Sequence, residues 1–335
     1  MATRGNWLSW MASFLRLLDP SKRIMRPSEA LQGLIAPIHK VMASSAWLAK
    51  IYLLLWSNLL RRLPGSRVKN RLVHSLEMIS WPAIAFKPIA VVVGKDTQLY
   101  ITPHHGEFDF AALFHRRLLY EKEVFYVLEK YIPYVDGIVE IGANVGVYTT
   151  FFSKLFSKLG RLDGIFAFEP SSEAFSRLRG NLRANKAENV HTFQCAVGER
   201  HGFMPFYEPE GHLTNGSLRP DFASIFSSIL QVKLALVLDG QDLAQLTAAY
   251  PKLLIKIDVE GSESAVLCSL RQLIETRTPT LVLEVLPDQA AHLNKLDFIH
   301  AHYMLFNITT HGLVRYEQFV ATSFRDYLLL PTLKI

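Results

Sequence analysis

The chain has 335 residues, of which 50% are hydrophobic and 20% are charged. A chain of this length and apolar content can bury one large core and still have residues left over, which excludes a single-helix or a disordered protein. The formal net charge of +6 at pH 7 permits contact with anionic surfaces but does not require a nucleic acid, and we predict no nucleic-acid partner.

The first quarter of the chain is basic, and its charges alternate with Trp, Leu and Phe. That pattern favours a membrane surface over a nucleic-acid groove. The basic residues are Arg4, Arg16, Lys22, Arg23, Arg26, Arg61, Arg62, Arg67, Lys69 and Arg71. The sequence shows no cleavable signal peptide, and Cys195 and Cys268 do not indicate a disulfide framework. We therefore expect a cytoplasmic protein that can associate with the inner face of a membrane.

Residues 41–60, VMASSAWLAKIYLLLWSNLL, form a long apolar segment with helical character. Three alternatives stay open for this segment: a membrane-spanning helix, a helix lying in the membrane interface with Trp47 and Trp56 as anchors, and a helix that packs on the rest of the protein. Lys50, near the middle of the segment, counts against a spanning helix.

Residues 63–66, Leu-Pro-Gly-Ser, end this lead-in because Pro cannot continue a helix. Residues 89–103 alternate apolar and polar residues around Gly94-Lys95-Asp96, which predicts a β-hairpin with its turn there. A helix from about Phe110 to Lys130 is expected next. The predicted parts of the chain are a helical, membrane-peripheral extension over residues 1–64, a hairpin-and-helix lead-in over residues 65–134 and a core domain over residues 135–335.

After Tyr134, short apolar runs alternate with helical patterns, as expected for βαβ units and a parallel sheet covered on both faces. The runs are GIVEIG, GIFAFE, VHTFQCAV, LLIKID and TLVLEV, and the helical patterns cover about residues 147–159, 172–185 and 262–275. We predict a mostly parallel α/β sheet with helices on both faces and an antiparallel last strand near residues 327–330. Residues 201–222, rich in Gly, Pro and Asn, are expected to form a hairpin or loop over the carboxyl edge of the sheet.

A glycine-rich turn, EIGANVGVY over residues 140–148, follows the first of these strands. Gly142 permits a sharp turn and the close approach of a ligand, and the next helix presents free N–H groups at its start. Glu169 ends the second strand, where an acidic side chain holds ribose hydroxyls in Rossmann-type nucleotide sites. The alternatives are tight packing at the turn and a solvated strand end at Glu169.

Several motifs together resemble the FkbM-type methyltransferase family. They are EIGANVGVYTTFFSK, IFAFEPSSEAFSRLRGNL, CAVGER, LLIKIDVEGSESAVL and PTLVLEV, in that order and spacing within residues 89–286. The resemblance implies a Rossmann-like methyltransferase fold and the cofactor S-adenosyl-L-methionine. It also implies O-methylation of a hydroxyl on a sugar, glycan or other small natural product.

The same resemblance assigns the cofactor-binding residues. The glycine-rich turn would line the methionine part of the cofactor, and Glu169 would hold its ribose. The turn residues are Glu140, Gly142, Asn144 and Gly146, and the adenine side is formed by Ala196 and Val197. Many related methyltransferases offer an acidic or amide side chain to adenine, so a backbone contact must substitute here. Tyr120-Glu121 matches a Tyr-Glu pair upstream of the turn, which makes Glu121 a catalytic candidate; the alternative is a helix-surface residue.

The segment KIDVEGSE places Asp258, Glu260 and Glu263 at the carboxyl end of a strand that should adjoin the first. Ligands gather at that edge of a parallel sheet, near the reversal of strand order. Methyl transfer is an in-line displacement that needs an aligned acceptor, and a hydroxyl acceptor benefits from a base. We hypothesise that Asp258 is the base and that Glu260 supports it. The alternative is that these carboxylates only cap the next helix and stabilise its start.

No metal is predicted, because the His and Cys residues show no zinc-like pairing; the alternative is a divalent ion shared by Asp258 and Glu284. Two rival functions also stay open. An NAD(P)-dependent oxidoreductase would use the same turn, although Asn144 replaces the middle Gly of the dinucleotide pattern. A non-catalytic, membrane-peripheral protein that retains the fold would be expected to have lost that turn. The sequence does not indicate the oligomeric state.

Overall fold

The computed structural model describes residues 38–39 and 41–332. The chain divides into two compact units, residues 1–86 with 104–115 and residues 87–103 with 116–335. Residues 1–37 of the predicted extension lie outside the described residues. The boundaries predicted near residues 64 and 134 stay predictions.

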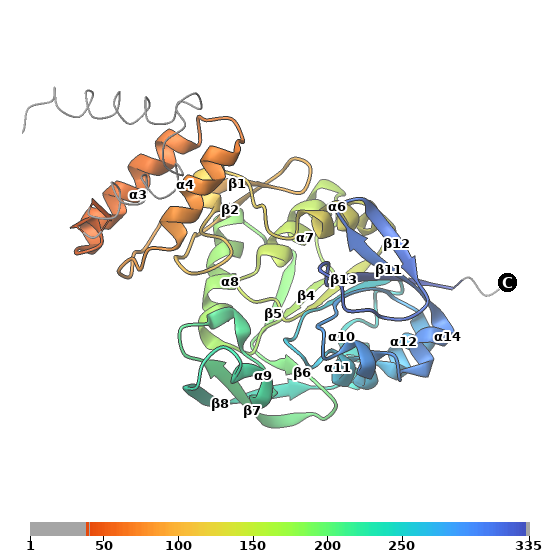
Figure 1. The fold of residues 1–335 in the computed structure, drawn as a ribbon. Coiled ribbons are helices and arrows are strands. Elements are labelled where there is room, and N and C mark those ends of the chain that lie inside the picture. The colour runs from red at the N-terminus through yellow and green to blue at the C-terminus, as the bar shows by residue number, and fades with distance from the viewer. Residues whose placement is uncertain (1–37, 40, 333–335) are drawn as a thin grey trace, which may run out of the picture. The chain divides into compact units, whose positions relative to one another are not determined.

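The first unit is helical and holds α3 (Ala46–Leu60), α4 (Arg67–Glu77) and α5 (Ala112–His115) (Figure 1). One face of α3 is buried, and the hydroxyl of Ser57 on that face donates a hydrogen bond of 2.6 Å to the carbonyl oxygen of Leu113 in α5. Ser66 caps α4, because its hydroxyl accepts a hydrogen bond from the N–H of Lys69. No helix in the described part of the chain combines the length and the apolar character that a bilayer crossing requires.

The second unit begins with the predicted hairpin, which is confirmed as β1 (Ile89–Val93) and β2 (Thr97–Ile101). The predicted single helix from Phe110 to Lys130 is wrong, because α5 ends at His115 and α6 (Lys122–Tyr131) begins only after a break. At the break, Arg116 has a φ of 55° and its carbonyl accepts a hydrogen bond from the N–H of Val92 in β1. Pairing with the hairpin therefore takes precedence over local helix propensity.

The main sheet has the order β12-β11-β13-β10-β9-β3-β4-β5. Its parallel strands are β3 (Gly137–Ile141), β4 (Ile165–Phe168), β5 (Val190–Phe193), β9 (Leu253–Ile257) and β10 (Thr280–Glu284). The antiparallel strands are β11 (Tyr303–Thr309), β12 (Gly312–Tyr316) and β13 (Asp326–Pro331). The mostly parallel sheet with an antiparallel last strand is thus confirmed, whereas the β11–β12 hairpin was not predicted.

Helices cover both faces of this sheet. They are α7 (Val147–Lys158), α8 (Ser172–Asn185), α10 (Gly240–Leu246), α11 (Glu263–Ser269), α12 (Arg271–Arg277), α13 (Ala290–Leu293) and α14 (Asp297–His302). Ile255 and Ile257 of β9 belong to a core cluster with α11 and α12, while Ala167 of β4 packs with Leu178 and Leu182 of α8. Because successive strand residues point to opposite faces, Lys256 of β9 points to the α7 side. The helix expected over residues 262–275 is split into α11 and α12.

A second, smaller sheet with the order β6-β8-β7 follows β5 in the chain. It consists of β6 (Ala196–Val197), β7 (Gly202–Pro209) and β8 (Leu230–Leu238), with the short helix α9 (Pro220–Ala223) between β7 and β8. The run VHTFQCAV, expected as one strand, is therefore two strands in different sheets. The hairpin expected over residues 201–222 begins there with β7, but its second strand, β8, lies beyond that range.

Candidate functional site

The glycine-rich turn lies between the ends of β4 and β9. The N–H groups of Gly142 and Ala143 donate hydrogen bonds to the carbonyl oxygen of Phe168, over 3.0 and 2.9 Å. Gly142 has a φ of 84°, and a Cβ built there would lie 1.8 Å from the carbonyl oxygen of Asp258. The strand order reverses at β3, between β4 and β9, which is where open α/β sheets bind ligands. The packing of the sheet therefore requires glycine at the position where the predicted cofactor turn begins.

Glu169 lies against this turn. The glycine-rich turn and the end of β4, which the sequence analysis assigned to one site, are therefore adjacent. Oε2 of Glu169 accepts a hydrogen bond from the N–H of Asn144 at 2.8 Å, and its Oε1 accepts one from the N–H of Ser171 at 2.8 Å. Burial raises the pKa of Glu169 to about 7, although these two hydrogen bonds oppose the rise. The side-chain Oδ1 of Asn144 is buried and has no hydrogen-bond partner among the described residues. Each bonded carboxylate oxygen of Glu169 keeps a lone pair that can accept a further donor.

Glu140 lies on β3 and points toward α7, where the hydroxyl of Thr149 donates a 2.6 Å hydrogen bond to its Oε2. The side chain is buried, and burial raises its pKa to about 8. Gly146, with a φ of 78°, caps the start of α7, and a Cβ there would lie 2.8 Å from Leu178. All four predicted turn residues thus lie on one strand-to-helix connection.

Ala196 and Val197 form β6 and pair with Val237 and Leu238 of β8. The chain reaches β6 from Phe193, whose carbonyl oxygen accepts a hydrogen bond from the N–H of Glu169 at 3.0 Å. A short stretch of backbone therefore links the Glu169 position to the strand that was assigned to adenine. The contact of Ala196 and Val197 with adenine stays a prediction.

A buried lysine, which the sequence analysis did not single out, connects the predicted catalytic residues. Nζ of Lys256 lies 2.7 Å from Oδ2 of Asp258 and 4.4 Å from the ring centre of Tyr148. The Tyr148 hydroxyl in turn donates a 2.7 Å hydrogen bond to Oε2 of Glu121. Burial alone would lower the pKa of Lys256, but Asp258 and Glu121 raise it above its ordinary value. The structure thus brings Glu121 and Asp258 to one cation; the signal in the sequence was a charged residue inside the apolar strand LLIKI.

Further carboxyl groups surround Asp258 at the carboxyl ends of β9 and β10 and at the amino end of the antiparallel strand β13. Burial raises the pKa of Glu260 to about 9 and that of Glu284 to about 8, and nearby Asp258 adds to both shifts. Burial also raises the pKa of Asp326, which lies opposite Glu284 in the β10–β13 register. Strand β9, which Asp258 directly follows, and strand β10, which ends at Glu284, are neighbours, as predicted. Within the described residues, no group of three or more His, Cys, Asp or Glu side chains is arranged to hold a metal ion.

Glu263 lies in the first turn of α11, as the alternative expected, but α11 has no side-chain cap. Oε1 of Glu263 accepts hydrogen bonds from the N–H groups of Val259 and Gly261, just before α11, at 3.3 and 3.1 Å. Asp258, by contrast, pairs with Lys256. The carboxylates of this segment therefore divide into one that organises the loop and one that pairs with the buried lysine.

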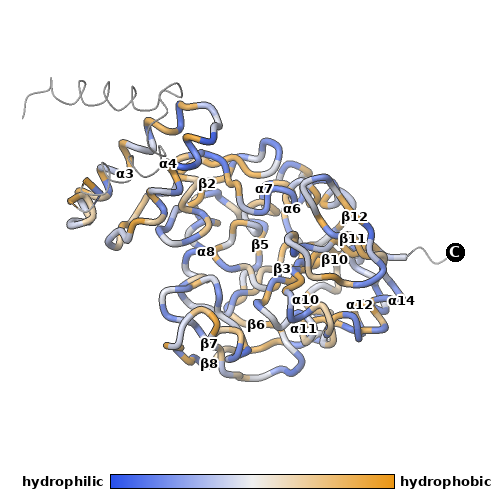
Figure 2. The backbone as a smooth tube through the Cα atoms, in the orientation of Figure 1, coloured by the Kyte–Doolittle hydropathy of each residue, from blue (hydrophilic) through white to orange (hydrophobic). Residues whose placement is uncertain are grey.

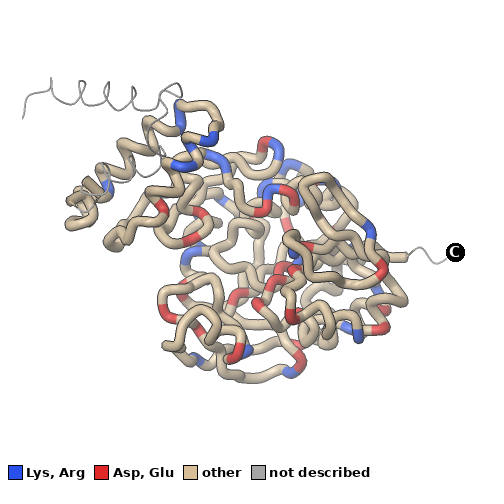
Figure 3. The backbone as a smooth tube through the Cα atoms, in the orientation of Figure 1, with Lys and Arg blue, Asp and Glu red and all other residues tan. Residues whose placement is uncertain are grey.

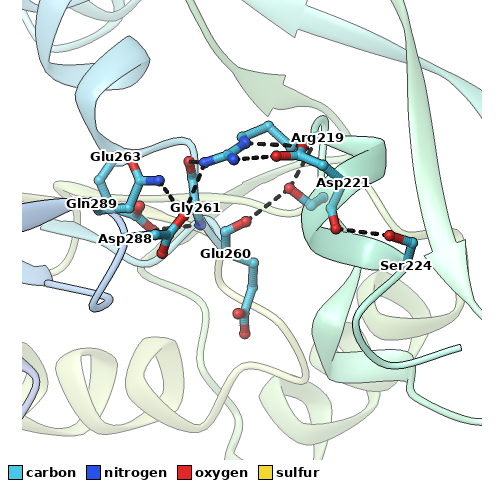
Figure 4. A network of polar contacts seen from close by, with 9 residues as sticks. Arg219, Asp221, Ser224, Glu260, Gly261, Glu263, Asp288 and Gln289 are labelled. Atoms are coloured by element: carbon cyan, nitrogen blue, oxygen red, sulfur yellow. Dashed lines mark hydrogen bonds and ion pairs between the residues drawn. The ribbon is translucent and has the colours of Figure 1, made fainter. Parts of the chain in front are cut away.

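The connection between β7 and β8 holds the loop after β9 in place (Figure 4). Nη1 of Arg219 donates to the carbonyl oxygen of Gly261 at 2.9 Å, and the hydroxyl of Ser217 donates to the carbonyl oxygen of Glu260 at 2.8 Å. The side chain of Glu260 points away from this polar network. Glu260 also has a φ of 54°, so its backbone adopts a left-handed conformation that these contacts support.

The acidic site predicts an unusual dependence of stability on pH. Five of its carboxyl groups have a pKa above the ordinary 4.5, reaching about 7 to about 9, so the folded state holds protons that the unfolded chain releases. The free energy of unfolding of the ligand-free protein is therefore expected to fall as the pH rises from about 4.5 to about 9. Urea unfolding at constant ionic strength across that range would measure the decline.

Glu260→Gln should flatten the upper part of this profile, because Glu260 has the highest pKa of the five groups, about 9. Glu173→Gln is the matched control, since Glu173 is 61% exposed and pairs with Arg177 on α8. A free energy of unfolding that stays constant or increases with pH would contradict the raised pKa values.

Comparison with known proteins shows which family and which solved structures the chain is similar to. The model of the methyltransferase FkbM domain matches residues 140–306. Among solved structures, the chain is similar to methyltransferase FkbM from Methylobacillus flagellatus KT, at 17% identity and a TM-score of 0.39, over 68% of this chain and 55% of that one. The chain thus spans 55% of the length of that protein. No curated protein sequence matches the chain.

Two other solved methyltransferases are similar over comparable lengths. Precorrin-6y C5,15-methyltransferase from Geobacter metallireducens GS-15 is 16% identical with a TM-score of 0.35, over 64% of this chain and 90% of that one. A SAM-dependent O-methyltransferase from Thermotoga maritima is 10% identical with a TM-score of 0.34, over 72% of this chain and 77% of that one. These values describe how similar the structures are, and they do not identify a substrate for this chain.

Proposed function

Because the chain belongs to the FkbM methyltransferase family through residues 140–306, we propose that it transfers a methyl group from S-adenosyl-L-methionine to a hydroxyl oxygen. The acceptor we propose is a sugar, a glycan or another small hydroxylated molecule. The observation that carries the proposal is the 2.8 Å hydrogen bond from the N–H of Asn144 to Oε2 of Glu169. It joins the glycine-rich turn and the ribose-type carboxylate into one site.

The residues of the turn fit this cofactor. The two ribose hydroxyls are donors, and both oxygens of Glu169 keep acceptor capacity after binding the backbone. The buried, unpartnered Oδ1 of Asn144 can accept a hydrogen bond from the amino group of the methionine part. The bound cofactor supplies an electrophilic methyl group on a positively charged sulfur. The positive charge of the bound cofactor would favour the ionised forms of Glu140 and Glu169, whose pKa values burial raises to about 8 and about 7.

The acceptor end of the proposed site is built around Asp258. In the proposed reaction the acceptor oxygen takes the methyl group in line, and the Asp258 carboxylate receives the proton that the hydroxyl loses. The ion pair with Lys256 fixes the position of that carboxylate. Glu260 and Glu284, with pKa values of about 9 and about 8, hold protons at neutral pH. A protonated carboxyl group both donates and accepts hydrogen bonds, which suits an acceptor rich in hydroxyls.

Titration of the purified protein with S-adenosyl-L-methionine, followed by calorimetry, tests the proposal. Glu169→Gln is expected to weaken binding about 10- to 100-fold. The amide cannot accept hydrogen bonds at both of its ends, so it loses either the Asn144 or the Ser171 contact and one acceptor for the ribose. Glu173→Gln, four residues further along, removes an exposed carboxylate and should leave the affinity unchanged.

Parallel titrations with NAD and NADP separate the rival functions. Binding of a nicotinamide dinucleotide in place of S-adenosyl-L-methionine would identify an oxidoreductase. Binding of neither cofactor would indicate a non-catalytic protein that retains the fold. Equal affinities of the Glu169→Gln variant and the unchanged protein for S-adenosyl-L-methionine would remove Glu169 from the site.

A further inference from the structure

Helix α3 exposes large apolar side chains along one face. Trp47 is 68% exposed and Leu55 is 63% exposed, and Ile51, Leu54 and Leu59 are each more than a third exposed. The spacing from Trp47 to Ile51, Leu55 and Leu59 is four residues each time, so these side chains follow one side of the helix. The opposite side, with Ala49, Leu53, Ser57 and Leu60, is buried. The helix is therefore apolar on both sides, but only one side packs against other described residues.

The surroundings of this exposed face carry positive charge. From residue 30 to residue 76 the sequence contains no Asp or Glu. The side chains of Arg61 and Arg62, which directly follow α3, are exposed, and so are those of Arg67 and Arg71 on α4. Figure 3 shows basic segments and no acidic segment in the turn from α3 to α4, and Figure 2 shows how much of α3 is hydrophobic. Lys69 does not contribute to this exposed positive charge, because its side chain is buried and its Nζ donates a hydrogen bond to the carbonyl oxygen of Leu63.

We propose that the exposed face of α3 docks on an anionic lipid surface. Trp47 and the leucines would enter the boundary between headgroups and acyl chains, while Arg61 and Arg62 would contact the phosphates. An apolar face bordered by basic residues is the arrangement of helices that lie in the membrane interface. Each basic residue near an anionic leaflet adds attraction. A second copy of this chain fits less well, because residues 30–76, which include the face, contain no Asp or Glu to meet the arginines.

Flotation of the full-length protein with lipid vesicles tests this surface. One set of vesicles contains phosphatidylcholine and phosphatidylglycerol, and the other contains phosphatidylcholine alone. We expect binding to the anionic vesicles that weakens with added salt. Leu55→Glu should weaken it about tenfold or more, because a charge replaces an inserted apolar group. The double variant Arg61→Gln, Arg62→Gln should weaken it roughly 25-fold.

Leu162→Glu is the matched control, because Leu162 is 84% exposed but lies between α7 and β4. Its binding to vesicles should equal that of the unchanged protein. Circular dichroism and S-adenosyl-L-methionine titration of every variant would establish that each one is folded. These measurements also keep a failure of lipid docking distinct from a failure of the proposed methyl transfer.

Three results would overturn the proposal. They are no binding to either kind of vesicle, equal binding to both kinds, and binding that Leu55→Glu leaves unchanged. An oligomer that Leu55→Glu dissociates, in a protein that does not bind vesicles, would assign the face to self-association instead.

Discussion

Asp258→Asn is expected to lower the turnover number for methyl transfer about 100- to 10,000-fold, the contribution typical of a positioned general base. The amide has nearly the shape of the carboxylate, and its oxygen can still accept the hydrogen bond from Nζ of Lys256, which now spans 2.7 Å. What it loses is the ability to take the proton of the acceptor hydroxyl. Transfer of a radiolabelled methyl group from S-adenosyl-L-methionine into an extract of the producing cells would measure the change.

Asp288→Asn is the control for this substitution. Asp288 follows β10, is 56% exposed and contacts Arg219 and Gln289, so its loss should leave turnover close to that of the unchanged protein. If Asp258→Asn bound the cofactor normally and kept near-normal turnover, Asp258 would have no part in the chemistry. Glu121→Gln and Glu260→Gln would then be the next variants to compare.

Gly142→Ala is expected to destabilise the fold by roughly 2–5 kcal/mol. Two costs combine at this position. The φ of 84° lies in the region that residues with a Cβ avoid, and the new Cβ would lie 1.8 Å from the carbonyl oxygen of Asp258. The backbones of β3 and β9 would have to separate, and urea unfolding would record the loss.

Gly160→Ala isolates the second cost. Gly160 has a φ of 73°, but a Cβ there would have no heavy atom within 4 Å. Its substitution should therefore cost only about 1–2 kcal/mol, the strain of the left-handed backbone alone. If both variants lost the same free energy of unfolding, the backbone at Gly142 would not be in close contact with the carbonyl group of Asp258. A smaller loss at Gly142 would contradict the strand packing itself.

The core of the fold could be predicted because its signals are local. Each parallel strand is a short apolar run bounded by polar or turn residues, and α8 covers residues 172–185 as its helical spacing indicated. Carboxyl ends of parallel strands share one edge of a sheet, so the positions of Gly142, Glu169 and Asp258 in the sequence implied that they would meet. The sequence by itself thus determined the parallel strands and the edge at which Gly142, Glu169 and Asp258 come together.

The tertiary structure alone decided how those residues interact. The contact of Lys256 with the Tyr148 ring, the position of Asp326 opposite Glu284 and the break before α6 all arise between segments far apart in the chain. The raised pKa values have the same origin, because burial depends on which segments pack over a carboxyl group. In α3, likewise, both faces are apolar in sequence, and the contacts with other helices decide which face is buried and which is exposed. Periodicity fixes which residues share a face, whereas long-range contacts fix what that face meets.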